Sequence, residues 1–359
     1  MNILHLQLTG NPGGIVSLCR DYANNSNDNN IIYFLFSGGI VADRIKSEGH
    51  QVVINEYGKK YWIKSAQRLN LFCKENDVDV IINHSNAPIS IFATSYVVRR
   101  NKNIKWLMYF HSDPEDMTIK QKILYRPFIQ YQIKHSDARL AISKCVKESA
   151  IRLFNIKPSK VEVVYNGVDI AKFKKKSINP VDKVRFIYVG RLFPAKGVHI
   201  LIEAINQLNK CENVMWTIVG DGPQKNELEQ MVHDLKLDDK VEFLGSRLDV
   251  PELLLEADYF IHPAIWNEGF GITLIEAMSV GLPCVAFNRG AMPEIISDNI
   301  NGFIINEINA NSLADGMIHC INIRNTEKYL KMVDDAICTA ERFSIANMVK
   351  NLENIIERC

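Results

Sequence analysis

The sequence predicts an α/β protein built from two doubly wound domains, each with a parallel sheet. The chain has 359 residues, whereas a single hydrophobic core stops growing at roughly 250–300 residues. Short β-rich runs alternate with longer helical patterns along the whole chain, which is typical of parallel α/β sheets. The strand runs are apolar almost throughout, as strands that are buried on both faces must be.

The first half of the chain follows this alternation. We expect strands at Ile3–Leu8, Ile31–Phe36, Val78–Ile82, Lys105–Phe110 and Ala138–Ile142. We expect helices between them, at residues 14–24, 62–76, 118–135 and 144–153.

The second half repeats the pattern after an Asn-Gly turn at 166–167 and a Lys-rich stretch at 172–183. Its expected strands are Val184–Val189, Val214–Val219, Val241–Leu244, Tyr259–His262 and Cys284–Phe287, with helices around 197–209, 223–235 and 272–280. The turn marks a domain boundary. We therefore predict domains at 1–168 and 169–341, and a last helix at 342–359 that crosses back to the first domain.

Composition and charge exclude several classes of protein. The chain is 47% hydrophobic and 23% charged, as in an average soluble protein, and a net charge of +1 argues against a nucleic-acid-binding protein. Residues 1–170 are nevertheless basic, with 22 Lys and Arg against 15 Asp and Glu, whereas the other 189 carry 20 against 26. Eight Cys are spread singly, which favours a reducing cytoplasm. No apolar run approaches the ~18 residues of a membrane-spanning helix.

Two cations follow the first strand of the second half. Arg191 and Lys196 lie five residues apart between Gly190 and Gly197, at the end of a strand where ligands of such sheets bind. A guanidinium fork and an ammonium point charge suit a diphosphate, and the bare glycine backbone permits close approach. Taken alone, the motif is also compatible with a solvated basic loop.

A second motif follows the strand Tyr259–His262. Gly269 and Gly271 lie between Glu268 and a predicted helix that contains Glu276. The positive end of that helix and the free backbone N–H groups predict an anion site. The two carboxylates should lie on either side of the anion, where each can accept hydrogen bonds from hydroxyl groups. The alternative is that Glu268 caps the helix and Glu276 faces solvent.

With these motifs, G-R-L-x-x-x-K-G at 190–197 and E-G-F-G-I-T-L-I-E at 268–276, the chain resembles the retaining glycosyltransferases of family 4. The resemblance extends over nearly the whole chain and includes N-G-V-D at 166–169 and E-R-F-S at 341–344. It implies the GT-B fold, in which two Rossmann-like domains face each other across a cleft, and a nucleotide-sugar donor.

The resemblance also implies roles for individual residues. Arg191 and Lys196 would hold the donor diphosphate, Glu276 the nucleotide ribose, and Glu268 hydroxyls of the transferred sugar. Further donor contacts are expected from Gly14, from Gly269, Phe270, Gly271, Ile272 and Thr273, and from Arg247 near the base.

The first half supplies weaker candidates. Gly14 belongs to a glycine turn at 9–15 that resembles the family's N-terminal glycine loop. His111 ends a strand where the family commonly has a histidine near the reacting end of the sugar, so we predict it as catalytic together with Glu268. His84 also ends a strand and is a weaker candidate. A lone His after a strand more often has a structural role.

The sequence shows no metal-binding motif, so we expect no metal and no cofactor beyond the donor, with the phosphate charge neutralised by Arg191, Lys196 and helix ends. One departure concerns the family's G-G-x-x-E motif, which appears here as a different loop at 289–294. We therefore assign no sugar contact to this loop.

The chemistry implied by the resemblance is transfer of a hexose to an acceptor hydroxyl with retention. No carboxylate is required as a nucleophile, because Glu268 is expected to bind sugar hydroxyls and the two-carboxylate scheme of glycosidases is absent. The resemblance implies a same-face attack, in which the leaving phosphate helps to accept the proton of the acceptor. A UDP-sugar is favoured by its frequency in the family. The expected acceptor is a glycan or lipid-linked molecule of polysaccharide or lipopolysaccharide biosynthesis.

The basic first half suggests a membrane partner. Basic side chains cluster at 59–64, 99–102 and 119–134, and in the first and last of these segments aromatic side chains lie among them. This composition suits an anionic membrane surface. The hypothesis is a cytoplasmic protein with peripheral contact to the inner face of the cytoplasmic membrane; the alternative is ordinary helices with solvated Lys side chains. Two alternative functions remain open: a nucleotide-sugar epimerase or phosphorylase on the same fold, and an inactive nucleotide-sugar-binding partner.

Overall fold

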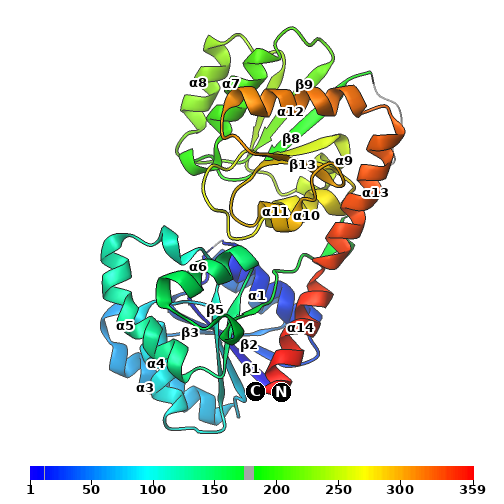
Figure 1. Cartoon of the computed structure of the whole chain (residues 1–359). Coiled ribbons are helices and arrows are strands. Elements are labelled where there is room, and N and C mark those ends of the chain that lie inside the picture. The colour runs from blue at the N-terminus through cyan, green and yellow to red at the C-terminus, as the bar shows by residue number, and fades with distance from the viewer. Residues whose placement is uncertain (12, 174–181) are drawn as a thin grey trace. The chain divides into compact units, whose positions relative to one another are not determined.

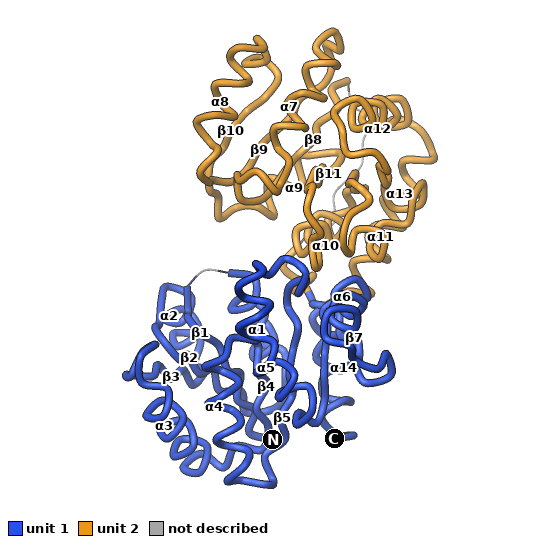
Figure 2. The backbone as a smooth tube through the Cα atoms, turned by 60° about the vertical axis from the view of Figure 1, so that its left-hand side comes forward, with its two compact units in different colours: residues 1–167, 345–359 blue, residues 168–344 orange. Residues whose placement is uncertain are grey.

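The computed structural model describes residues 1–11, 13–173 and 182–359, which form two compact units. Unit 1 comprises Met1–Gly167 and Ile345–Cys359, and unit 2 comprises Val168–Ser344 (Figure 2). The predicted boundaries after residues 168 and 341 lie close to these divisions. Most of the Lys-rich stretch expected between the domains, residues 174–181, lies outside the described residues.

Unit 1 contains a seven-stranded parallel sheet in the order β3-β2-β1-β4-β5-β6-β7. Figure 1 labels β1, β2, β3 and β5 of this sheet. Its strands are β1 Asn2–Thr9, β2 Asn29–Ser37, β3 Gln51–Ile54, β4 Val80–Asn83, β5 Lys105–Phe110, β6 Ala138–Ala141 and β7 Glu162–Val163. Its helices are α1 Gly14–Asn25, α2 Ile40–Ser47, α3 Trp62–Glu75, α4 Pro88–Val98, α5 Ile119–His135, α6 Lys144–Phe154 and α14 Ile345–Arg358.

Helices cover both faces of this sheet, as strand β2 illustrates. Tyr33 points into a core with residues of α3 and α4, whereas its neighbours Ile32 and Phe34 pack with α1 and α2. Because successive side chains of a strand point to opposite faces, a strand covered on both sides is apolar at most of its positions. The terminal helix α14 packs beside α1, and Lys105 Nζ donates a hydrogen bond of 2.8 Å to the carbonyl oxygen of Ile356.

Unit 2 contains a six-stranded parallel sheet in the order β10-β9-β8-β11-β12-β13. Its strands are β8 Val184–Val189, β9 Val214–Val219, β10 Val241–Gly245, β11 Tyr259–His262, β12 Cys284–Phe287 and β13 Gly302–Ile305. Its helices are α7 Val198–Gln207, α8 Lys225–Asp234, α9 Val250–Glu256, α10 Ile272–Ser279, α11 Met292–Ile295, α12 Ala310–Ile323 and α13 Glu327–Arg342. The two predicted Rossmann-like sheets are thus confirmed.

Candidate active site

Two loops of unit 2 that are far apart in sequence lie against each other. The loop 190–197 follows β8 and the loop 263–271 follows β11, and these two strands are neighbours in the sheet. The backbone N–H of Ile265 donates to the carbonyl oxygen of Ala195 at 3.0 Å. Gly197 has φ 69°, and a Cβ atom there would lie 2.0 Å from the carbonyl oxygen of Pro263. Only glycine therefore permits this approach of the two loops.

The contact between the loops joins two of the predicted residues, Lys196 and Glu268. The ammonium of Lys196 forms an ion pair with the carboxylate of Glu268, and both side chains are largely buried. Trp266 Nε1 donates to Glu268 Oε2 at 2.9 Å, and His262 Nε2 lies 3.7 Å from the same oxygen. The Lys196 ammonium also lies 5.3 Å from the centre of the Trp266 ring. Neither Trp266 nor His262 was predicted from the sequence, although His262 lies at the end of an expected strand as His111 does.

The surroundings of Glu268 keep its carboxyl group ionised. Burial by itself raises the pKa of Glu268, but its interactions with His262 and with the positive charge of Lys196 outweigh burial and lower the pKa to about 2. Burial lowers the pKa of His262, so this imidazole is neutral at physiological pH. Glu268 can therefore accept hydrogen bonds from hydroxyl groups, but it has no proton to give as a general acid.

The end of this loop forms the predicted start of a helix. Helix α10 begins at Ile272 with Gly271 as its N-cap, and no side chain caps its first turn. Backbone N–H groups at an uncapped helix N-terminus are available to an anionic ligand. Gly269, Phe270 and Thr273 lie in the same segment. Phe270 is buried, with its ring centre 5.6 Å from that of Phe343.

The remaining predicted donor-binding residues of unit 2 have varied surroundings. Arg191 is exposed at the start of its loop, 5.6 Å from the ring centre of Phe193. Glu276 is half-buried, one turn into α10. Arg247 is paired with Asp249 through contacts of 2.7 and 2.5 Å. Arg191 and Lys196 thus differ, since one is open to solvent and the other is held by a carboxylate.

The divergent loop at 289–294 lies next to Glu268. The backbone N–H of Ala291 donates to the carbonyl oxygen of Glu268 at 2.8 Å. Gly290 has φ 54°, and a Cβ atom there would lie 2.2 Å from that oxygen. Although its sequence departs from the usual pattern, this loop fixes the backbone that carries Glu268.

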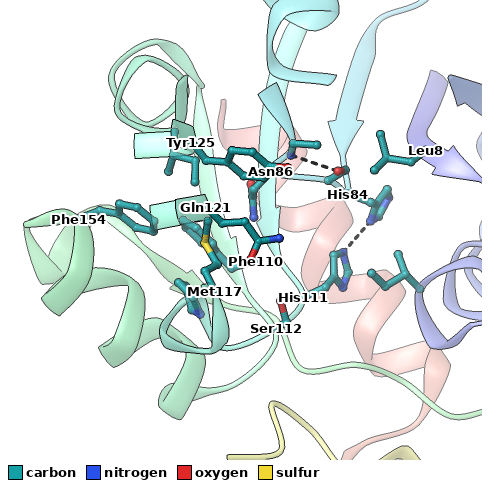
Figure 3. Close-up of a pocket in the computed structure, with 15 residues that line it drawn as sticks. Leu8, His84, Asn86, Phe110, His111, Ser112, Met117, Gln121, Tyr125 and Phe154 are labelled. Atoms are coloured by element: carbon teal, nitrogen blue, oxygen red, sulfur yellow. Dashed lines mark hydrogen bonds between the residues drawn. The ribbon is translucent and has the colours of Figure 1, made fainter. Parts of the chain in front are cut away.

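Unit 1 has two adjoining pockets at the carboxyl ends of its central strands. One of 340 Å³ is lined by His84, Asn86 and His111 (Figure 3). The other, of 310 Å³, is lined by Gly13 and Gly14 and again by His84. Gly14 is the first residue of α1, which has no side-chain cap. The candidates of the first half therefore gather at one edge of the sheet.

His111 is the outermost ring of a row of three histidines. Its Nε2 lies 2.8 Å from Nδ1 of His84, and Nε2 of His84 lies 2.9 Å from Nδ1 of His5. Nε2 of His5 lies 3.1 Å from Oδ1 of Asn30. We call His5, His84 and His111 the histidine chain. His5 was not predicted from the sequence, and His84 was predicted only as a weaker candidate than His111.

The histidine chain is uncharged. Burial lowers the pKa of His111 to about 3 and, despite the hydrogen bond to Asn30, lowers the pKa of His5 to about 4. The pKa of His84 is lowered by burial and by its two histidine neighbours. All three rings are therefore neutral imidazoles at physiological pH, each with one hydrogen on nitrogen.

Within the described ranges, His5, Cys19 and His84 form a buried group with the spacing of metal ligands. Two of its nitrogens already face each other in the hydrogen bond between His5 and His84. Burial raises the pKa of the Cys19 thiol, which disfavours the thiolate that binds metals. This chemistry favours the hydrogen-bonded chain as the resting arrangement.

Known proteins share both the sequence pattern and the fold. Residues 15–172 match the family described as Glycosyltransferase Family 4, and residues 169–336 match that described as Glycosyl transferases group 1. The structure of Alr3699/HepE from Anabaena, solved with UDP, matches with a TM-score of 0.87 and 24% identity over 100% of both chains. The chain belongs to the GT-B glycosyltransferases of the family 4 type.

Other relatives of the chain differ in how much of their length the chain matches. The chain is 27% identical to the Escherichia coli UDP-Gal:alpha-D-GlcNAc-diphosphoundecaprenol alpha-1,3-galactosyltransferase over 66% of this chain and 62% of that protein. It is 25% identical to N-acetyl-alpha-D-glucosaminyl L-malate synthase of Bacillus anthracis over 85% of this chain and 82% of that enzyme. An uncharacterized glycosyltransferase of Methanocaldococcus jannaschii, MJ1607, is 30% identical to the chain. The match covers 60% of this chain and 58% of MJ1607.

Proposed function

We propose that the chain transfers a hexose with retention from a nucleoside-diphosphate sugar, with UDP as the favoured nucleotide, to a hydroxyl of a glycan or lipid-linked acceptor. The pathway would be biosynthesis of a cell-surface polysaccharide or lipopolysaccharide. The observation that carries this proposal is the Lys196–Glu268 ion pair beside the uncapped start of α10. This site combines a cation and an anion-binding helix end with a carboxylate that accepts hydrogen bonds from hydroxyl groups.

The arrangement suggests how the donor is held. The diphosphate would take Lys196, Arg191 and the first-turn N–H groups of α10 as its partners, since all three carry positive charge or hydrogen-bond donors. Glu268 would bind hydroxyls of the sugar and Glu276 those of the ribose. Stabilisation of the leaving diphosphate is then the main catalytic contribution, and that phosphate would take part in accepting the proton of the acceptor.

The relatives support the nucleotide and the class of acceptor. The E. coli relative is named for transfer of galactose from UDP-Gal to an undecaprenol-linked GlcNAc. HepE has been solved with UDP, with UDP and glucose, and with UDP-glucose. We therefore choose UDP-sugars as the first donors to test and polyprenyl-linked glycans as the first acceptors to test.

Release of nucleotide from a panel of UDP-, GDP- and ADP-sugars tests the proposal. We expect release from at least one UDP-sugar, faster when a polyprenyl-linked glycan is added. The same panel without acceptor distinguishes the alternatives: an epimerase would convert the donor sugar without releasing nucleotide, and a phosphorylase would require phosphate. Binding without turnover under any condition would instead indicate an inactive binding partner.

A membrane surface is the partner we propose for one side of unit 1. Ile119, Ile123 and Leu124 on α5 are 78%, 72% and 56% exposed, and Lys120 and Arg126 on the same helix are also exposed. In the described ranges no helix is both long and apolar enough to cross a membrane. Exposed apolar side chains among cations suit the interface of an anionic bilayer.

The start of α3 extends this surface. Tyr61 and Ile63 are 56% and 61% exposed, and Lys64 lies 5.4 Å from the ring centre of Tyr61. Trp62 between them packs against Phe128 of α5, with ring centres 6.1 Å apart. The two apolar and basic segments therefore lie side by side. We call residues 61–64 and 119–126 the basic apolar surface.

Vesicle flotation tests the basic apolar surface. We expect the chain to float with phosphatidylglycerol vesicles at low salt, and less at high salt, because exposed charges are screened. The double variant Lys120→Glu/Ile123→Ser should lose most of this binding. Ile318→Ser, which changes an exposed Ile of unit 2, is the matched control. Equal flotation of both variants, or none of the wild type, rejects the membrane partner.

A further inference from the structure

The anchor of the histidine chain decides where its hydrogens lie. Asn30 is buried on β2, and its amide nitrogen donates to the carbonyl oxygen of Asp28 at 2.8 Å. A carbonyl oxygen can only accept, so the side-chain oxygen of Asn30 must be the atom that faces His5. Nε2 of His5 therefore carries the hydrogen that this oxygen accepts.

This assignment extends from ring to ring. A neutral imidazole has one N–H, so Nδ1 of His5 is bare, meaning that it carries no hydrogen. It accepts a hydrogen bond from Nε2 of His84. Nδ1 of His84 is then bare and accepts from Nε2 of His111. Nδ1 of His111 is left without a hydrogen. In the reverse arrangement, a bare nitrogen of His5 would face the oxygen of Asn30, and two buried acceptors would remain unpaired, which folded proteins rarely tolerate.

We propose that Asn30, His5 and His84 are positioning residues that hold His111 in the tautomer with hydrogen on Nε2, so that its Nδ1 accepts a hydrogen bond from a substrate hydroxyl. The selection of a sugar or acceptor hydroxyl rests on the proposed function, whereas the tautomer does not. A bare nitrogen pairs with a hydroxyl and repels the oxygens of a phosphate. His111 is therefore suited to the sugar or the acceptor and not to the diphosphate.

The surroundings of the histidine chain agree with this role. The ring of Tyr109 lies 4.3 Å from that of His111, and the ring of Tyr22 lies 5.1 Å from that of His5, measured between centres. Burial raises the pKa of both tyrosines, so the chain is flanked by neutral groups. His111 lines the pocket as the half-buried outer member, and Figure 3 shows its hydrogen bond to His84.

Nitrogen NMR of the full chain, labelled with ¹⁵N-histidine, reads the tautomer directly. The signal of His111 is assigned by its disappearance in His111→Gln. We expect Nε2 protonated and Nδ1 bare in the wild type. Asn30→Leu removes the oxygen that accepts from Nε2 of His5. The fraction of His111 with its hydrogen on Nε2 should then fall toward about half, because the two directions of hydrogen bonding along the histidine chain compete.

The control for Asn30→Leu is Asn29→Leu, which changes the neighbouring exposed position on β2. It should leave the His111 signal unchanged. A hydrogen on Nδ1 of His111 in the wild type overturns the proposal, and so does an unchanged tautomer in folded Asn30→Leu. Stoichiometric zinc in the purified chain that is lost in Cys19→Ser would also overturn it, because the same nitrogens would then bind metal.

Kinetics distinguish the two sources of the hydroxyl. With UDP-glucose as the probe, Asn30→Leu should raise the KM of whichever substrate contacts His111 by about two-fold, with little change in kcat. A rise for UDP-glucose without weaker UDP binding assigns the donor sugar, and a rise only for the acceptor assigns the acceptor. Unchanged KM values for both substrates reject the contact. If no nucleotide sugar is turned over but NMR finds the expected tautomer, the proposed function fails and the positioning role stands.

Discussion

Glu268→Gln lowers turnover of the nucleotide sugar by about a hundredfold or more, which is the cost of removing one preorganised electrostatic contact from an active site. The amide keeps the shape of the side chain but loses its charge, so it binds hydroxyls less strongly and no longer pairs with Lys196. The measurement is the initial rate of nucleotide release at saturating donor.

The pKa of Glu268 adds a pH dependence to this prediction. Because the folded-state pKa is about 2, the charge of Glu268 contributes to stability fully above its usual pKa of 4.5 and is lost only as the pH falls toward about 2. Titration of Glu268 therefore causes no loss of rate between about pH 5 and pH 9.

The control for Glu268→Gln is Glu203→Gln, an exposed change on α7. Wild-type rates in Glu268→Gln would remove Glu268 from the catalytic site.

Lys196→Ala weakens donor binding and lowers turnover by orders of magnitude, because the leaving diphosphate loses a cation. It also destabilises unit 2, since removing one partner of a buried ion pair leaves the other charge unpaired, at a cost of about 3–5 kcal/mol. Calorimetry with UDP and UDP-glucose measures the first effect, and thermal unfolding measures the second.

A second variant separates these two effects of Lys196. In Lys196→Ala/Glu268→Ala the unpaired carboxylate is gone, so the double variant should be more stable than Lys196→Ala but equally inactive. Lys210→Ala, at an exposed position of unit 2, controls for the loss of one positive charge. If Lys196→Ala binds and turns over the donor as the wild type does, Lys196 has no role in the diphosphate site.

The fold could be predicted where hydrophobic pattern and flanking turns agree. Strands Lys105–Phe110 and Val214–Val219 have the bounds expected from their apolar runs. Edge strand Gln51–Ile54 was not predicted, because its four residues are only partly buried and carry little pattern. Helix Pro88–Val98 was also missed. It is apolar on every side, since it lies between α3 and α5, and a helix without a polar face shows no 3.6-residue period.

The candidate site could be predicted only in part. Lys196 and Glu268 belong to compact motifs after strands, so their proximity follows from the order of parallel strands. Trp266 supports Glu268 through a loop conformation that no spacing encodes. His5 lies inside an apolar strand and meets His84 only because β1 pairs with β4. Interactions that depend on the pairing of distant strands leave no local pattern in the sequence.

Isothermal calorimetry with a panel of UDP-, GDP- and ADP-sugars, applied to the wild type and to Lys196→Ala/Glu268→Ala, measures whether the two loops joined by this ion pair form the donor site. We predict saturable binding of at least one UDP-sugar by the wild type and none by the folded double variant. Equal binding by both proteins would place the donor elsewhere, and no binding of any nucleotide sugar by the wild type would contradict the account.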